Sequence, residues 1–157
     1  ISGPQAFTVP LEWYVQTEGN ATLVLLEGVT SKGSLTATGL ASLVCRGPMA
    51  GDMLFLSWTT ALVRGDLSGD IEGFSYFQLV VTGKFSGDIS THSGAMIYLL
   101  GGCQGSLELE GSRVYIAGRT SRDDLARIKG TGEVYLERSD LPPGQHQIGD
   151  LTVTVAE

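Results

Sequence analysis

Short apolar segments, separated by Gly, Ser, Asp and Pro, make up most of the chain. Val, Ile, Thr, Tyr and Phe are concentrated in these segments, and such residues favour strands over helices. Evenly spaced short strands with turn residues between them are typical of a sandwich or a barrel rather than of a βαβ fold. The pattern predicts strands over residues 6–16, 22–30, 34–45, 53–64, 70–82, 94–100, 105–110, 112–118, 131–138 and 150–156.

Two segments depart from this pattern. Ser121 provides an N-cap, acidic residues follow it, and Gly130 provides a stop, so we expect a helix of one or two turns that plugs one end of a barrel. Pro10 interrupts the first apolar segment, and proline is confined to edge strands and bends. Residues 1–16 are therefore expected to form a lid or an edge arm.

The distribution of apolar residues over the two faces differs between strands. Residues 150–156 alternate between apolar and polar, which indicates a strand with one wet face. Residues 53–58 and 74–81 are apolar on both faces, which in a parallel sheet would require helices on both sides. The sequence supplies too few helices for that. We therefore expect a barrel wall with an apolar inside and an outside that is buried in an oligomer.

Residues 65–72 resemble residues 83–90, and each copy contains Ser-Gly-Asp. This tripeptide has the chemistry of a turn or bulge, so it predicts places where strands bend or reverse.

Composition adds limits on partners. The 157 residues fit one domain, residues 1–157, and 17% of them are charged, against about 25% in ordinary soluble domains. This scarcity of charge predicts a homo-oligomer, a dimer or trimer. The net charge of −7 would repel a phosphate backbone, so no nucleic-acid partner is expected. The apolar runs are far shorter than the ~20 residues of a membrane span. We expect a cytoplasmic protein, with secretion as the alternative.

The residues with reactive side chains form no standard motif. Two histidines are too few for a His-rich metal site, and no nucleophile elbow, phosphate loop or dinucleotide fingerprint is present. No metal, no cofactor and no catalytic residue are therefore assigned. Cys45 and Cys103 lie far apart and make no CxxC pair, so buried free thiols and a disulfide both stay open.

The candidate binding residues are aromatic or polar side chains embedded in apolar strands. If they point inward, they give a mostly hydrophobic lumen with a few polar anchors, which is how small-molecule sites are built. Trp13 would lie on the lid over one mouth of the barrel. The candidates for substrate binding are Trp58, Tyr76, Gln78, Tyr98, Tyr115, Glu27 and Trp13.

The second half of the chain resembles the allene-oxide-cyclase-like barrel group, which includes allene oxide cyclases, dirigent proteins and spirotetronate-type [4+2] cyclases. The resemblance is carried by residues 68–73, 81–87 and 124–133. Gly101-Gly102-Cys103-Gln104 stands where the group has Gly-Gly-Thr-Gly. The resemblance implies an eight-stranded antiparallel barrel with a hydrophobic cavity, no cofactor, and frequent dimers or trimers.

These observations lead to three functional hypotheses. The first is a cofactor-independent cyclase or isomerase that folds a reactive, polyketide-like hydrophobic molecule for intramolecular ring closure, chiefly by confinement. The alternative is a lipocalin-like binding or carrier barrel for a hydrophobic small molecule. The third is a structural oligomeric barrel without a ligand.

Overall fold

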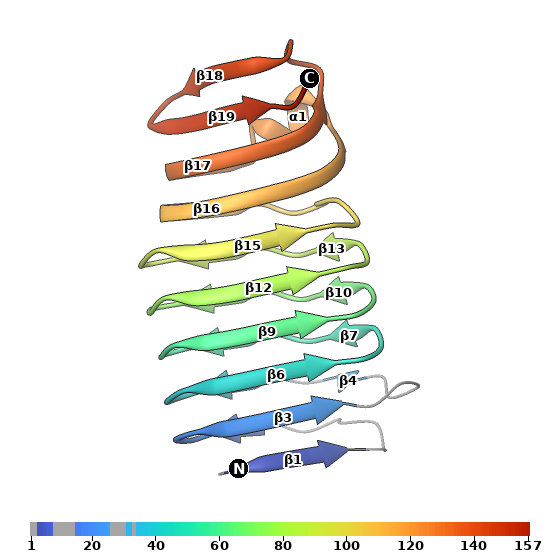
Figure 1. Cartoon of the computed structure of the whole chain (residues 1–157), viewed down its shortest axis with the longest axis vertical. Coiled ribbons are helices and arrows are strands. Elements are labelled where there is room, and N and C mark those ends of the chain that lie inside the picture. The colour runs from blue at the N-terminus through green and yellow to red at the C-terminus, as the bar shows by residue number, and fades with distance from the viewer. Residues whose placement is uncertain (1–2, 8–14, 26–30, 33) are drawn as a thin grey trace.

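The computed structural model describes residues 3–7, 15–25, 31–32 and 34–157. The chain winds into a parallel β-solenoid of about 7 turns. Figure 1 shows its coils stacked along one axis, with the termini at opposite ends. The expected antiparallel barrel is therefore wrong, although the all-β class is confirmed.

The middle coils contribute strands to three sides of the solenoid. The first side carries β1 (Pro4–Phe7), β3 (Ala21–Leu25), β6 (Ala41–Cys45), β9 (Thr59–Val63), β12 (Phe77–Val81) and β15 (Ala95–Leu99). The second side carries β4 (Ser31–Lys32), β7 (Met49–Ala50), β10 (Leu67–Ser68) and β13 (Phe85–Ser86). The third side carries β2 (Val15–Thr17), β5 (Leu35–Ala37), β8 (Met53–Phe55), β11 (Ile71–Gly73) and β14 (Ile89–Thr91).

The C-terminal coils are built from longer strands. β16 (Leu107–Thr120) and β17 (Ile128–Ser139) each run along the third side and then the first. β19 (Leu151–Val155) continues the parallel ladder on β17, and β18 (Gly144–Ile148) pairs with it antiparallel. The helix α1 (Arg122–Leu125) connects β16 to β17 and lies at the C-terminal end of the solenoid, behind β17 and β19 in Figure 1. The short helix predicted after Ser121 is thus confirmed.

The spacing of the coils explains the repeat in the sequence. Phe77 pairs with Thr59 on one side and with Ala95 on the other, so equivalent positions in the middle coils are 18 residues apart. Residues 65–72 and 83–90 occupy equivalent positions in successive coils. Their Ser-Gly-Asp segments form corners between the second and third sides and do not reverse the chain. The similarity to the cyclase barrels is therefore overturned.

Other strand predictions fail at corners for the same reason. The segments expected as single strands over 34–45, 53–64 and 70–82 are each divided into two by a corner. Of the expected lid or edge arm, Pro4–Phe7 forms β1, which pairs with β3 in parallel. Pro10 and Trp13 lie outside the described residues.

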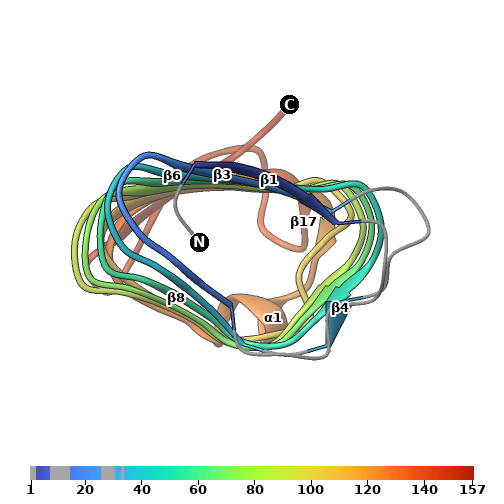
Figure 2. The same cartoon turned by 90° about the horizontal axis from the view of Figure 1, so that it is seen from below.

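The interior of the solenoid is filled by side chains. Viewed along the axis, the coils superimpose as one closed ring (Figure 2). Inward-facing residues of successive coils form continuous stacks, and Phe55 and Phe77 pack with ring centroids 5.1 Å apart. Leu79, Ile89 and Ile97 are almost completely buried. The hydrophobic lumen expected of a barrel is therefore replaced by a packed core. No helix in the described ranges is long and apolar enough to span a membrane.

Candidate functional site

The outward side of β3, β6, β9, β12, β15, β16, β17 and β19 forms a continuous sheet surface, here called the flat face. Neighbouring strands are paired in register, so outward side chains line up in rows along the solenoid axis. The polar row consists of Thr22, Ser42, Thr60, Gln78, Met96, Arg113, Glu133 and Thr152. The apolar row consists of Val24, Val44, Leu62, Val80, Tyr98, Tyr115, Tyr135 and Thr154.

A third row, the edge row, follows the C-terminal ends of these strands. It starts with two exposed cations, Arg46 and Arg64, and continues through Thr82 and Leu100. Glu137 occupies the corresponding place on β17, one residue beyond the buried Leu136. Charge along the edge row therefore changes from positive near the N-terminal coils to negative near the C-terminal end.

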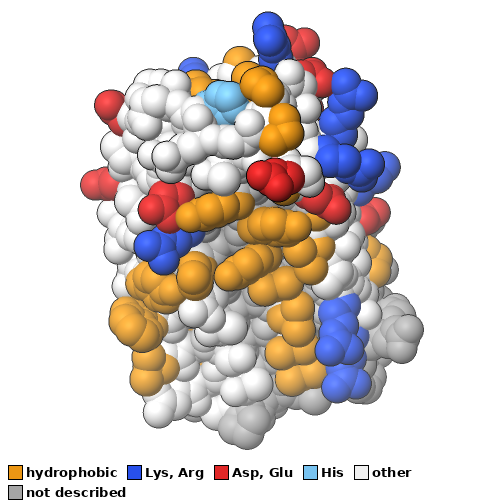
Figure 3. Space-filling model, turned by 45° about the horizontal axis from the view of Figure 1, so that its top comes forward, with side chains coloured by type: hydrophobic (Ala, Val, Ile, Leu, Met, Phe, Trp, Pro, Cys, Tyr) orange, Lys and Arg blue, Asp and Glu red, His pale blue; other side chains and the backbone are white. Residues whose placement is uncertain are grey.

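An aromatic corner borders the flat face on the opposite side, where the chain turns from the third side onto the first. Trp58 is 63% exposed and Leu40 is 59% exposed. The Trp58 and Tyr76 rings lie 5.3 Å apart, and the Phe74 ring stacks on His92 at 4.4 Å. Hydrophobic side chains gather in groups over this part of the molecule in Figure 3.

A surface groove of about 380 Å³ separates the aromatic corner from the polar row. Leu40, Trp58 and Tyr76 form one wall, and Thr60 and Gln78 contribute to its lining. The Gln78 amide donates a hydrogen bond to the Tyr76 hydroxyl at 3.3 Å. The groove is uncharged and open to solvent, so it offers ring faces and amide or hydroxyl groups to a ligand.

A second groove of about 240 Å³ lies at the tyrosine end of the apolar row. Tyr98 and Tyr115 lie 6.3 Å apart across it. Nε of Arg113 lies 3.0 Å from Oε2 of Glu133, which also accepts a hydrogen bond from the Tyr135 hydroxyl at 3.1 Å. That hydrogen bond and the negative charge of Glu133 raise the pKa of Tyr135. The groove is therefore lined by phenols and one paired cation.

The structure separates the predicted binding residues into two groups. Trp58, Tyr76 and Gln78 meet in the first groove, and Tyr98 and Tyr115 meet in the second. They all face outward, so none lines a lumen. Glu27 and Trp13 lie outside the described residues.

Two parts of the candidate surface were not predicted from the sequence. They are the aliphatic half of the apolar row, and Leu40 and Phe74 of the aromatic corner. A signal for these residues was present. Trp58 follows Leu40, and Tyr76 follows Trp58, at the interval that separates equivalent positions in successive coils.

Three aspartates at the corners between the second and third sides have structural partners. Oδ1 of Asp52, Asp70 and Asp88 each accept a backbone N–H from the next coil, at 2.9 to 3.0 Å. Among the described residues, no group of three or more His, Cys, Asp and Glu side chains is placed to hold a metal ion. These aspartates therefore hold the corners of the coils together.

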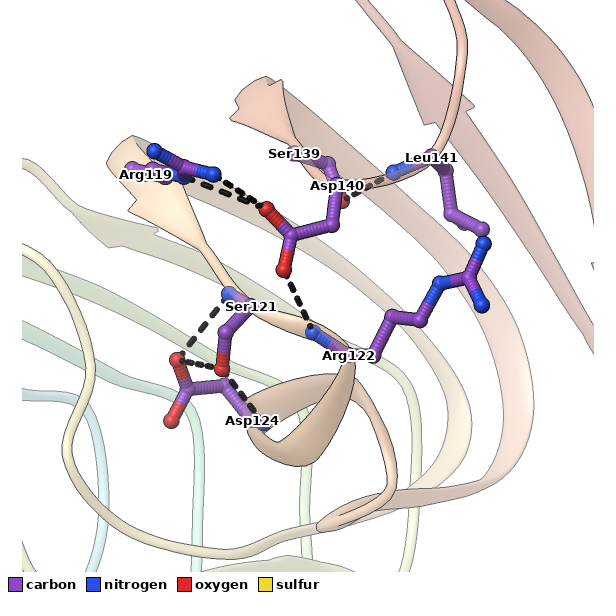
Figure 4. Close-up of polar contacts among 7 residues, drawn as sticks. All are labelled: Arg119, Ser121, Arg122, Asp124, Ser139, Asp140 and Leu141. Atoms are coloured by element: carbon purple, nitrogen blue, oxygen red, sulfur yellow. Dashed lines mark hydrogen bonds and ion pairs between the residues drawn. The ribbon is translucent and has the colours of Figure 1, made fainter.

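The polar cluster at the C-terminal end also serves the fold (Figure 4). The Ser121 hydroxyl accepts a hydrogen bond from the Asp124 N–H, and the Asp124 carboxylate accepts from the Ser121 N–H, which is a capping box on α1. Asp140 accepts from the Arg119 guanidinium at 2.6 Å and from the Arg122 N–H at 3.3 Å. These bonds lower the pKa of both carboxyls, with Ser121 the main cause at Asp124 and Arg119 at Asp140.

Both cysteines are free thiols, which resolves the alternative that the sequence left open. Cys45 is buried and Cys103 is half-buried. Burial raises the pKa of each thiol, so neither has the lowered pKa of an activated nucleophile.

Comparison of the chain with protein-family models, with curated proteins and with solved structures finds no match.

Proposed function

We propose that the chain is a structural module that self-associates through its flat face. The observation that carries this proposal is the apolar row, which presents Val, Leu and Tyr side chains outward on successive strands from β3 to β17. Tyr98 is 39% exposed and Tyr135 is 42% exposed. Exposed apolar surface that continues over a whole face marks a site of protein association in soluble proteins.

The composition of the flat face supports a protein partner. Tyr, Met and Arg are enriched in protein interfaces, and Met96, Arg113 and the tyrosines occur together on the C-terminal half of this face. The low charge content of the chain, which predicted a homo-oligomer, agrees with covering this face by a second copy.

The cyclase and carrier hypotheses assumed a hydrophobic lumen, and the interior of the solenoid is packed. Any small-molecule chemistry would therefore have to take place on the outer surface. The cyclase stays a prediction that no observation here tests.

The self-association test compares the wild type with Tyr98→Lys by light scattering over a concentration series. Burying a lysine against an apolar partner surface is costly, so we expect Tyr98→Lys to weaken association by at least about tenfold. Ser90→Lys is the matched control, because Ser90 faces outward from β14 on the third side. A wild-type chain that stays monomeric at all accessible concentrations would reject the proposal.

A hydrophobic-ligand carrier is the second candidate, because Trp58, Tyr76 and Gln78 line one groove. An apolar dye should then quench tryptophan fluorescence, and Trp58→Ala should abolish that quenching while Ser90→Ala leaves it unchanged. Equal quenching in wild type and Trp58→Ala would remove the support for this candidate.

A further inference from the structure

The geometry points to one mode of pairing: two copies stack their flat faces with the solenoid axes antiparallel, about a twofold axis that crosses between β12 and β15. This inference rests on the proposed self-association. The partner on the flat face is a second copy of the chain. Such a pairing is isologous, so the same surface must be complementary to itself after reversal.

The apolar row is complementary to itself in size. Its N-terminal half is aliphatic, and the C-terminal half carries the tyrosines. Reversal of the row about its midpoint therefore places each bulky ring over a smaller side chain. The resulting pairs are Val80 with Tyr98, Leu62 with Tyr115, Val44 with Tyr135, and Val24 with Thr154.

One pair in the edge row is complementary in charge. The same reversal places Arg46 opposite Glu137, Arg64 opposite the uncharged Ala117, and Thr82 opposite Leu100. Arg46 and Glu137 are exposed in the single chain, and neither forms an ion pair within the part of the chain that the structure describes. Opposite charges at these places favour the antiparallel arrangement over alternatives.

A parallel pairing in register is disfavoured by the same side chains. Two faces that meet with parallel axes are related by a twofold along the apolar row, which reverses the strand direction and places the edge row over the polar row. Glu137 would then face Glu133, and like charges across an interface are repulsive. The parallel pairing would also place tyrosine on tyrosine at one end and valine on valine at the other. The distance between the two sheets would then have to differ between the two ends of the interface. The polar row is compatible with the antiparallel arrangement, because reversal places Arg113 over Thr60 and Glu133 over Ser42, so no like charges face each other.

Cross-linking distinguishes the two arrangements. Val44→Cys and Tyr135→Cys are made separately in a Cys103→Ser background, mixed in equal amounts, and treated with a bismaleimide spanning about 10 Å, the distance between packed sheets. In the antiparallel pair the two cysteines face each other. In the parallel pair they are separated by about 24 Å along the axis, five strand spacings. We expect Val44→Cys to cross-link to Tyr135→Cys and not to itself.

Charge reversal provides a second readout in the otherwise unaltered chain. Arg46→Glu and Glu137→Arg should each weaken the dimer by about fivefold, and Arg46→Glu/Glu137→Arg together should restore it. Lys129→Glu controls for the change in net charge, since Lys129 is exposed on the third-side portion of β17.

The outcomes separate the two proposals. A dimer that cross-links Val44→Cys to itself, or that the double reversal fails to restore, overturns antiparallel pairing and leaves self-association standing. A monomer in light scattering overturns both.

Discussion

The backbone N–H of Asp88 donates a hydrogen bond to Oδ1 of Asp70, one coil earlier, across 2.9 Å. The same bond joins Asp70 to Asp52, and Ser106 donates to Asp88 at 3.0 Å. These bonds form a ladder in which each aspartate serves both as a corner residue and as the acceptor for the next corner. The ladder supplies acceptors for N–H groups that leave the regular strand pairing at a corner.

Asp70→Ala should therefore lower the free energy of unfolding by about 1 kcal/mol, because it leaves the Asp88 N–H without its acceptor. Asp70→Asn keeps an acceptor oxygen and should cost about half as much. Urea unfolding followed by circular dichroism measures both. Equal losses in the two variants would show that charge, rather than the hydrogen bond, matters here.

Gly87 should be far less replaceable than Gly149. Gly87 has φ of +141°, and a Cβ there would lie 2.2 Å from the carbonyl oxygen of Gly69 in the preceding coil. Gly149 has φ of +58° with open space around it. Gly149→Ala should cost about 1 kcal/mol of left-handed strain, whereas Gly87→Ala adds a backbone clash and should cost more than about 3 kcal/mol. Similar unfolding midpoints for the two variants would contradict this close stacking of the coils.

The packed interior predicts a strong contrast between two neighbours on β14. Ile89 is completely buried, and Ser90 points outward. Ile89→Ala should destabilise the protein by about 2–5 kcal/mol through lost burial and the cavity left behind, whereas Ser90→Ala should change stability by less than about 0.5 kcal/mol. Chemical denaturation of both variants tests this. A loss below about 1 kcal/mol for Ile89→Ala would indicate that the interior is loosely packed.

Local signals in the sequence predicted local structure well. Ser121 and the acids that follow it predicted α1, because an N-cap acts within a few residues. Gly130, expected as the stop of this helix, instead lies inside β17, beyond the helix end at Leu125. The all-β class followed from strand-forming residues in short segments.

The pairing of the strands could not be predicted in the same way. Alternation along one strand says which residues are buried, but it does not say which strand is the partner or in which direction that partner runs. The similarity of residues 65–72 to 83–90 held this information, because repeated segments in register imply stacked coils. The Ser-Gly-Asp segments have turn chemistry, which is the same at a corner of a coil and at a reversal of the chain, so their composition does not distinguish the two.

The candidate site was also predicted in part: which residues lie together was predicted, and the direction in which they point was not. Trp58, Tyr76 and Gln78 do lie together, because their positions repeat from coil to coil. They were expected to point into a lumen, since residues 53–58 and 74–81 are apolar on both faces. In the solenoid one face packs the core, and the other exposes the aromatic corner and the flat face.

Acid should weaken the polar cluster at the C-terminal end of the solenoid. The pKa of Asp140 is lowered by its hydrogen bond from Arg119 and by the Arg122 N–H, and Ser121 lowers that of Asp124. A carboxyl whose folded pKa lies below its unfolded value stabilises the fold at pH values above the unfolded pKa. That stabilisation is lost as the pH falls through the folded pKa. The loss therefore begins near the ordinary value of about 3.9 and is complete at lower pH.

Asp140→Asn should consequently melt at a lower temperature than the wild type at neutral pH and at the same temperature in strong acid, so that the two curves converge below about pH 4. Asp123→Asn is the control. Asp123 lies in α1 next to Asp124, is exposed, and its side chain makes no hydrogen bond or ion pair within the described residues. The control variant should follow the wild type throughout. Differential scanning calorimetry across this pH range measures the convergence. A gap between wild type and Asp140→Asn that stays constant into strong acid would mean that the Asp140 carboxylate charge does not hold this end of the solenoid together.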